Sequence, residues 1–375
     1  MRALVLGKGK SGAAAAALLK AQGCEVDFAD GYDCVVVSPG LRTKSELQLG
    51  CEELKRRGWK LLAVTGSKGK SSVVKVVADA INLAGMKAVA CGNYGMPVCE
   101  VAFEDGRRET EDGKVRWAVV EVSSFMMETT VLPSDTFEAA AILNLQEDHL
   151  DRHGSVEVYH GLKRKLLGMT RHPIEADGSS FDRRSGDRFS MLWKGSYFDN
   201  EILADNAAMA VGLMRVAGLD DGVIARAFRE FEPLPHRMNL VAEIDGVRYV
   251  DDSKATSLAA LVAGVKMASG SVRLIAGGLP KGDDPKRALP TLTERVKKVY
   301  LIGQSAEVFF AAWNGAVDCE ICGTMERAVE KAMREAEKGE TVLLSPGTAS
   351  FDQFQSYGER GEVFARLVKK EGQPK

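Results

Sequence analysis

The feature that most constrains the fold is a glycine-containing segment between an apolar run and a helical pattern. Leu61–Val64 has the character of a buried strand, Thr65-Gly66-Ser67-Lys68-Gly69-Lys70-Ser71 follows, and helical periodicity then continues to about Ala84. Backbone N–H groups of such a turn, with a helix N-terminus, form a cradle for anions. Lys70 can reach phosphate oxygens and Ser71 can offer a hydroxyl to Mg²⁺. The segment predicts a phosphate loop, although Val64 stands where the standard spacing has its first glycine.

The rest of the chain alternates apolar strands with helical patterns, which is typical of α/β folds with parallel sheets. We expect a short first unit over residues 1–58, a central unit over 59–232 and a third unit over 233–375. Pro233 and Pro235 break the preceding helix and mark the last boundary. Expected strands are 3–7, 25–28, 34–37, 61–64, 117–122, 139–145, 247–250, 273–276, 298–302 and 341–344.

Composition excludes several classes of protein. The 375 residues are 45% hydrophobic and 27% charged, as in globular proteins, and the net charge of −2 provides no basic field for nucleic acid. The longest apolar runs, such as Ala13–Leu19, are too short to span a bilayer, and no signal peptide is recognised, so a cytoplasmic protein is expected. Seven cysteines, among them a lone CxxC at Cys319 and Cys322, are predicted to be reduced structural thiols.

Polar residues gather where expected strands of the central unit end. Glu121 closes the strand over 117–122, and the run from Asn144 to His153 follows the strand over 139–145. Carboxyl ends of strands in an open α/β sheet face the ligand crevice. Glu121 is therefore a candidate metal ligand, and Asp148 and His149 are candidate metal or phosphate partners.

Three further loops follow strands of the third unit. They are residues 252–256, 277–282 and 345–354, and the first two contain a lysine placed to bind negative charge. Three such loops at successive strand ends predict one composite site.

Taken together, these segments resemble the Mur ligase family, and within it most closely the branch that adds D-glutamate. The glycine loop is also shared with folylpolyglutamate synthetase, whereas Leu234–Arg237, Asp252–Thr256 and Ala349–Phe354 are more specific to the D-glutamate branch. The segments that carry the resemblance run in the same order over nearly the whole chain: Thr65–Ser71, Gly92–Gly95, Glu121–Phe125, Asn144–His153, Leu234–Met238, Asp252–Thr256, Gly277–Gly282, Ser345–Phe354 and Arg360-Gly361.

The resemblance implies a short Rossmann-like N-terminal domain for a UDP-substrate, a central P-loop ATPase domain and a C-terminal Rossmann-like domain for the amino acid. It implies ATP-dependent amide formation through an acyl phosphate, adding D-glutamate to UDP-N-acetylmuramoyl-L-alanine. ATP would be the co-substrate, two Mg²⁺ ions would assist, and the enzyme would be a cytoplasmic monomer. Its product would serve peptidoglycan synthesis and hence cell-wall biogenesis, cell shape and cell division.

Site residues follow from the same resemblance, position by position. Lys70, Glu121, His149 and Lys163 would be catalytic, with Ser71, Glu121, His149 and Lys163 at the metals. Lys163, four residues after Tyr159, matches a carbamylated lysine of the family, with Lys165 as the alternative. The ATP site would comprise Gly66, Ser67, Lys68, Gly69, Lys70, Ser71, Ser72, Asn93, Asn206, Arg237 and Asp252. Thr256, Lys281, Ser350, Phe351 and Tyr357 would hold D-glutamate, and Lys10, Ser11, Ser38, Pro39 and Gly40 the UDP-substrate.

The sequence departs from the family pattern in three places. The first unit lacks a βα stretch between Phe28 and Cys34, only Asn206 remains of an asparagine motif before the last central helix, and Met126 replaces a usual Gln. An alternative is therefore a ligase on the same scaffold that forms amides or rings on a carboxylate without UDP. A non-catalytic nucleotide-binding protein is disfavoured because Lys70, Glu121, His149 and Lys163 are all present. An NAD-dependent oxidoreductase is disfavoured because no hydride-transfer site is recognised.

Overall fold

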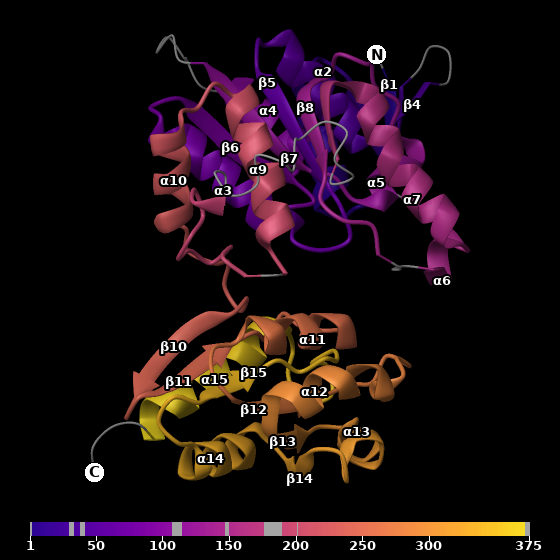
Figure 1. The fold of residues 1–375 in the computed structure, drawn as a ribbon. Coiled ribbons are helices and arrows are strands. Elements are labelled where there is room, and N and C mark those ends of the chain that lie inside the picture. The colour runs from indigo at the N-terminus through magenta and orange to yellow at the C-terminus, as the bar shows by residue number, and fades with distance from the viewer. Residues whose placement is uncertain are drawn as a thin grey trace. The chain divides into compact units, whose positions relative to one another are not determined.

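The computed structural model describes residues 2–29, 34–37, 42–106, 115–146, 150–175, 190–200 and 202–371. The chain divides into two compact units, Met1–Phe231 and Glu232–Lys375 (Figure 1). The first unit contains two sheets and the second contains one. The three domains expected over 1–58, 59–232 and 233–375 stay a prediction beside this division. No helix among the described residues is both long and apolar enough to cross a membrane.

The first sheet has the order β2-β1-β3-β4. Its elements are β1 (Arg2–Leu6), α1 (Lys10–Ala21), β2 (Glu25–Ala29), β3 (Cys34–Val37), β4 (Arg42–Lys44) and α2 (Glu46–Arg56). Strands β1 and β2 are parallel across helix α1, whereas β3 is antiparallel to β1 and β4 to β3. A parallel return would need a crossover of a dozen or more residues. The four positions between β2 and β3 are too few for one, so the Rossmann-like part ends at β2.

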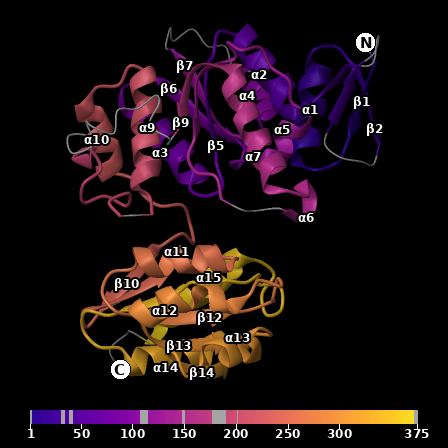
Figure 2. The same cartoon turned by 45° about the vertical axis from the view of Figure 1, so that its right-hand side comes forward.

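The central sheet has the order β6-β7-β5-β8-β9, and all its pairings are parallel. Its elements are β5 (Lys60–Thr65), α3 (Lys70–Leu83), β6 (Lys87–Gly92), α4 (Val98–Gly106), β7 (Arg116–Glu121), α5 (Ser124–Thr129), β8 (Phe137–Ile142), α6 (Leu150–His153), α7 (Val156–Arg164), η1 (Lys165–Met169), β9 (Thr170–Glu175), α9 (Ala204–Val216) and α10 (Asp221–Arg229). Strands β5, β7 and β8 are almost wholly buried, as expected where helices cover both faces. Helices α3, α9 and α10 pack together beside the sheet (Figure 2).

The second unit is a six-stranded sheet of order β10-β11-β15-β12-β13-β14, parallel except for the β10–β11 hairpin. Its elements are β10 (Asn239–Ile244), β11 (Val247–Asp251), α11 (Leu258–Met267), β12 (Val272–Gly277), η3 (Pro285–Ala288), α12 (Leu289–Arg295), β13 (Val296–Ile302), α13 (Ala306–Trp313), β14 (Asp318–Gly323), α14 (Met325–Glu335), β15 (Thr341–Leu344) and α15 (Tyr357–Glu371). Asp245 and Gly246 both have positive φ, which matches the two-residue turn that favours a hairpin.

Two separate apolar cores cover the faces of this sheet. Helices α11, α12 and α13 supply one core, and α14 and α15 supply the other. Cys319 belongs to the first core and Cys322 to the second, because residues three apart on a strand point to opposite faces. Six of the cysteines are free and buried, and the side chains of the CxxC pair lie on opposite faces of the sheet.

Candidate active site

The segment predicted to be a phosphate loop lies between β5 and α3. Gly66 and Gly69 have φ values of 151° and 83°, and α3 begins directly after Gly69. The Lys70 ammonium folds back and donates to the carbonyl oxygens of Gly66 and Ser67, at 2.8 and 3.2 Å. Ser71 is half-buried and Ser72 is buried in the first turn of α3. Lys70 and Ser71 therefore stand at the helix N-terminus, where an anion would be bound.

Ser67 connects the loop to two neighbouring segments. Its hydroxyl accepts from the backbone N–H of Gln146 at 3.0 Å and donates to the Gln146 carbonyl at 3.1 Å. Tyr159, on α7, places its hydroxyl 3.2 Å from the same oxygen. Sequence reasoning used Tyr159 only to locate Lys163 and so missed this contact with the loop.

Glu121 ends β7 at the same sheet edge, since it is in register with Val64 of β5. Its side chain is only 3% exposed, and Oε1 accepts a 2.9 Å hydrogen bond from Asn93. Oε2 is buried and has no hydrogen-bond partner among the described residues. Mg²⁺ in phosphate-transfer sites is usually held by one or two carboxylates together with water and substrate phosphates. A carboxylate oxygen without a partner, beside the glycine loop, fits that demand.

Lys163 is almost fully buried on α7, and its amine also donates to the Gly66 carbonyl, at 2.9 Å. The amine lies 4.5 Å from the Tyr159 ring centroid. Lys165, the alternative, donates instead to the Met127 carbonyl at 3.1 Å. The geometry therefore favours Lys163 over Lys165 as the lysine at the phosphate loop.

Several other predicted site residues of the first unit lie outside the described residues. Asp148, His149, Ser38, Pro39 and Gly40 lie outside them. No group of three or more His, Cys, Asp or Glu side chains able to hold a metal occurs in the described part of the chain.

Asn206 and the N-terminus of α1 are described. The Asn206 amide is buried near Gly69, where a β-carbon on that glycine would meet it at 2.0 Å. Lys10 begins α1, with Ser11 next to it, and lines an open cleft of about 620 Å³ between α1 and α4.

Asp252 lies at the carboxyl end of β11, in the second unit, and is 8% exposed. The Ser345 hydroxyl donates to its Oδ2 at 2.9 Å. Burial raises the pKa of Asp252 to about 7, against the opposing effects of the Ser345 hydrogen bond and of Arg237, which is half-buried. Next to it, Asp251 and His236 are paired at 2.7 Å. A buried carboxyl with a pKa shifted by its surroundings is a typical feature of functional sites.

The three loops predicted to form a composite site are indeed neighbours within this unit. Leu279 donates its N–H to the Ala349 carbonyl at 2.9 Å, which joins the loops after β12 and β15. Arg360 is fully buried and donates to Ser253 through its Nε and to the Ser253, Thr348 and Ala349 carbonyls, at 2.9 to 3.2 Å. Sequence reasoning noted Arg360 only as part of the family resemblance and missed this bridging position.

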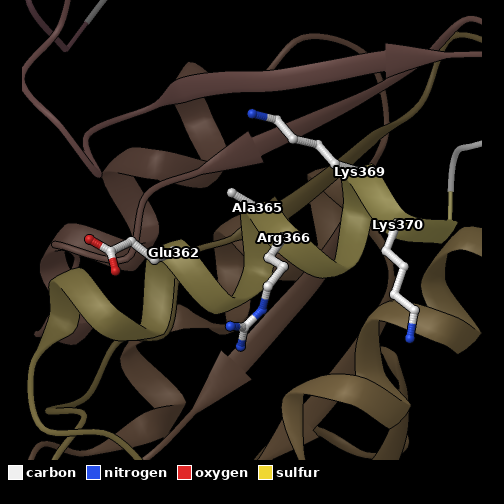
Figure 3. A pocket seen from close by; sticks show the side chains of 5 residues that line it. All are labelled: Glu362, Ala365, Arg366, Lys369 and Lys370. Carbon is white, nitrogen blue, oxygen red and sulfur yellow. The ribbon is translucent and has the colours of Figure 1, made fainter.

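The predicted D-glutamate residues stand on or beside these loops. Ser350 is buried, Thr256 is half-buried, and Phe351 is 70% exposed. Lys254 places its ammonium 3.8 Å from the ring centroid of Tyr357. Lys281 is exposed and makes no ion pair with any described carboxylate, so its charge is available to a ligand. A shallow pocket of about 520 Å³ on α15, lined by Glu362, Ala365, Arg366, Lys369 and Lys370, contains none of these residues (Figure 3).

Comparisons with known proteins all point to the same family. Residues 64–175 match the Mur ligase middle domain, and residues 236–347 match the Mur ligase glutamate ligase domain. The UDP-N-acetylmuramoylalanine–D-glutamate ligase of Acidobacterium capsulatum is 32% identical over 98% of this chain and 96% of its own length. The enzyme of the same name from Nitratidesulfovibrio vulgaris (strain DP4) is 33% identical over 98% of this chain and 95% of its own length.

Solved structures show the same fold. The MurF ligase of Thermotoga maritima, solved in complex with ADP, has a TM-score of 0.63 over 98% of this chain and 95% of its own, at 16% identity. A UDP-N-acetylmuramoyl-L-alanyl-D-glutamate–2,6-diaminopimelate ligase has a TM-score of 0.58, at 17% identity over 88% of this chain and 83% of its own. The chain belongs to the Mur ligase family.

Proposed function

We propose that this protein is an ATP-dependent ligase that adds D-glutamate to UDP-N-acetylmuramoyl-L-alanine during peptidoglycan synthesis. The full-length similarity to enzymes of that name supports the assignment. The structural observation that carries it is the convergence of Lys70, Lys163 and the unpartnered oxygen of Glu121 at one sheet edge. A monomeric, cytoplasmic enzyme remains a prediction from the sequence.

The proposed reaction has two steps. The carboxylate of the acceptor attacks the γ-phosphorus of ATP, ADP leaves, and an acyl phosphate forms. The amine of D-glutamate then attacks the acyl carbon, a proton leaves the nitrogen, and phosphate departs with the electrons of the broken C–O bond. In the first step, charge grows on the phosphoryl oxygens, which Lys70 and the N-terminus of α3 would stabilise.

Two Mg²⁺ ions are part of the proposal. Ser71, Glu121, Lys163 and His149 would hold them, and bound Mg²⁺ would neutralise phosphate charge. The residues around the loop support part of this set: Glu121 Oε2 is buried and unpartnered, and Ser71 begins the helix that follows the loop. Asn93, which holds the other oxygen of Glu121, orients this carboxylate.

Lys163 is proposed to be carbamylated. The Lys163 amine is almost fully buried and reaches the Gly66 carbonyl, which also accepts from Lys70, so a carbamate on Lys163 would stand beside the phosphate loop. A neutral amine can react with CO₂, and the carbamate would supply an anionic oxygen. We expect Lys163→Ala to lose activity and to regain part of it with added short-chain carboxylates. Lys165→Ala is the matched control, and electron density for an unmodified Lys163 in crystals of the active, metal-loaded enzyme would contradict the proposal.

D-glutamate would bind to the second unit. Lys281 offers a cation, and Thr256 and Ser350 offer hydroxyl groups, which suits a dicarboxylate. Lys10, Ser11 and Ser38–Gly40 are proposed to contact the UDP-substrate. The 455-position alignment with the Acidobacterium capsulatum enzyme, set against 375 residues here, leaves at least 80 positions without a counterpart. This shortening keeps the alternative open, a ligase whose carboxylate substrate carries no UDP.

One assay distinguishes the proposed D-glutamate ligase from the alternative ligase, whose carboxylate substrate carries no UDP. Phosphate release from ATP is measured with D-glutamate, in the presence and absence of UDP-N-acetylmuramoyl-L-alanine. Release that needs both substrates supports the proposed function. Release that needs neither the UDP-substrate nor D-glutamate would contradict it, and D-glutamate-dependent release with a simple carboxylate acceptor would favour the alternative.

A further inference from the structure

Asn144 follows β8 and contacts the phosphate loop through its side chain. Its carboxamide oxygen accepts from the backbone N–H of Lys68 at 2.8 Å, and its amide donates to the Lys68 carbonyl at 2.9 Å. The backbone carbonyl of Asn144 also accepts from the N–H of Ser67, at 2.9 Å. One residue therefore satisfies three backbone groups of the loop.

The same carboxamide links the loop to α9. Its amide donates a second hydrogen bond, at 3.2 Å, to the side-chain oxygen of Asn206. The Asn206 amide nitrogen in turn occupies the space beside Gly69, where a β-carbon would come within 2.0 Å. The two asparagines thus hold the loop at Lys68 and Gly69, immediately before α3 begins.

A glycine-containing loop needs such support. Gly66 and Gly69 both have positive φ, and glycine loses more conformational freedom than any other residue when it is ordered. Binding of phosphate to a loop that is not already ordered would have to meet that entropy cost. Fixed hydrogen bonds from Asn144 would leave less ordering to be done when a nucleotide binds.

We propose that Asn144 is a positioning residue for nucleotide binding. Its carboxamide holds Lys68 and Gly69 in the phosphate-binding conformation and couples them to Asn206. This inference rests on the proposed function, because it assumes that the loop binds the phosphates of ATP. The acceptor and the amino acid are not involved.

The test is Asn144→Asp, which keeps the shape of the side chain. A carboxylate still accepts from the Lys68 N–H, but it cannot donate to the Lys68 carbonyl or to Asn206 and repels both oxygens. Loss of two neutral hydrogen bonds corresponds to roughly 10- to 100-fold in binding. We expect the Kd of MgADP, measured by calorimetry, and the KM for ATP to rise by about that factor, with the KM for D-glutamate unchanged.

Asn82→Asp is a closely matched control. The Asn82 carboxamide makes the same two contacts with one residue, accepting from the Ala88 N–H at 2.8 Å and donating to its carbonyl at 3.1 Å. It stands in the last turn of α3, about 18 Å along the helix from the loop. We expect Asn82→Asp to leave the Kd of MgADP unchanged, even if both variants lose similar stability.

The outcomes separate the inference from the function. If wild-type protein binds MgADP and Asn144→Asp binds it equally well, the inference is wrong and the proposed function stands. If wild-type protein neither binds MgADP nor releases phosphate, the proposed function fails as well. If Asn144→Asp does not fold, Asn144→Ser takes its place, and an unchanged Kd in that variant would overturn the inference.

Discussion

Two lysine side chains converge on the carbonyl oxygen of Gly66, and this arrangement dominates the candidate site at the scale of single residues. Lys70 comes from the loop itself, whereas Lys163 comes from α7, 97 positions away from Gly66. Both amines therefore stand at the carbonyl that opens the glycine loop, where the phosphates of ATP would lie under the proposed function.

Lys70→Ala tests this reading of the loop. We expect phosphate release to fall by about 100-fold or more, because the lysine would meet charge that develops in the transition state. The far-UV circular dichroism should stay unchanged, since the hydrogen bonds of Lys70 to the Gly66 and Ser67 carbonyls lie in the loop and outside the helices and strands. Lys75→Ala, which breaks a surface pair with Asp79 on the same helix, is the control. More than about a tenth of wild-type release in Lys70→Ala would be hard to reconcile with a phosphate loop.

Lys281→Met tests the amino-acid site. Loss of one charge-assisted hydrogen bond corresponds to about 10- to 100-fold in affinity. We therefore expect the KM for D-glutamate to rise by that factor while the KM for ATP changes little. Lys286→Met, an exposed lysine five positions further on, serves as the control. Equal changes in both KM values would mean that Lys281 does not contact the amino acid.

Strand ends explain, at the scale of elements, which parts of the site the sequence could predict. Glu121 and the phosphate loop follow apolar runs, and parallel pairing necessarily brings such ends to one edge of a sheet. The bridging roles of Asn144, Tyr159 and Arg360 depend on side-chain geometry between distant segments, which periodicity does not encode. Strands β6, β10 and β14 were not predicted. The apolar run of β6 is short and only half-buried, and β10 and β14 lie at sheet edges, where apolar and polar residues mix.

Asp252 makes the stability of the second unit depend on pH. Burial raises the pKa of this carboxyl from its ordinary 3.8 to about 7, so the unfolded chain loses the proton first as the pH rises. Between about pH 4 and pH 7 the folded state binds more protons than the unfolded chain, so the free energy of unfolding falls as the pH rises. Above pH 7 this decrease in the free energy of unfolding is complete and amounts to about 4 kcal/mol at most.

We expect Asp252→Asn to remove this loss, because an amide does not ionise and its oxygen still accepts from Ser345. The Tm of the variant should exceed that of the wild type at pH 8, and the difference should shrink toward pH 5. Asp245→Asn, at the exposed turn of the same hairpin, should show no such trend. A Tm difference that is constant from pH 5 to pH 8 would mean that Asp252 does not titrate near neutrality.

At the scale of the whole molecule, the sequence predicted part of the division of the chain into units. Pro233 and Pro235 predicted a boundary at residue 233, and the compact units meet between Phe231 and Glu232. The antiparallel return of β3 in the first sheet was not predicted, because no apolar pattern distinguishes strand direction. It follows from the short connection after β2 rather than from the strand residues themselves.

The second unit should fold without the first. Residues 232–375 contain a complete six-stranded sheet with a separate apolar core on each face, and 144 residues is an ordinary size for a domain. The hydrogen bonds of the buried Arg360 go to Ser253, Thr348 and Ala349 of the same unit, so they do not depend on residues 1–231. We expect a fragment of residues 232–375 to show a cooperative thermal transition and a radius of gyration of about 15 Å by X-ray scattering.

The matched control is the same fragment with Arg360→Met. This substitution removes the donor to the Thr348 and Ala349 carbonyls and to Ser253, so the variant should melt at a lower temperature. A wild-type fragment with no cooperative transition, or with a radius near the 39 Å or so of an unfolded chain of this length, would mean that the unit depends on residues 1–231.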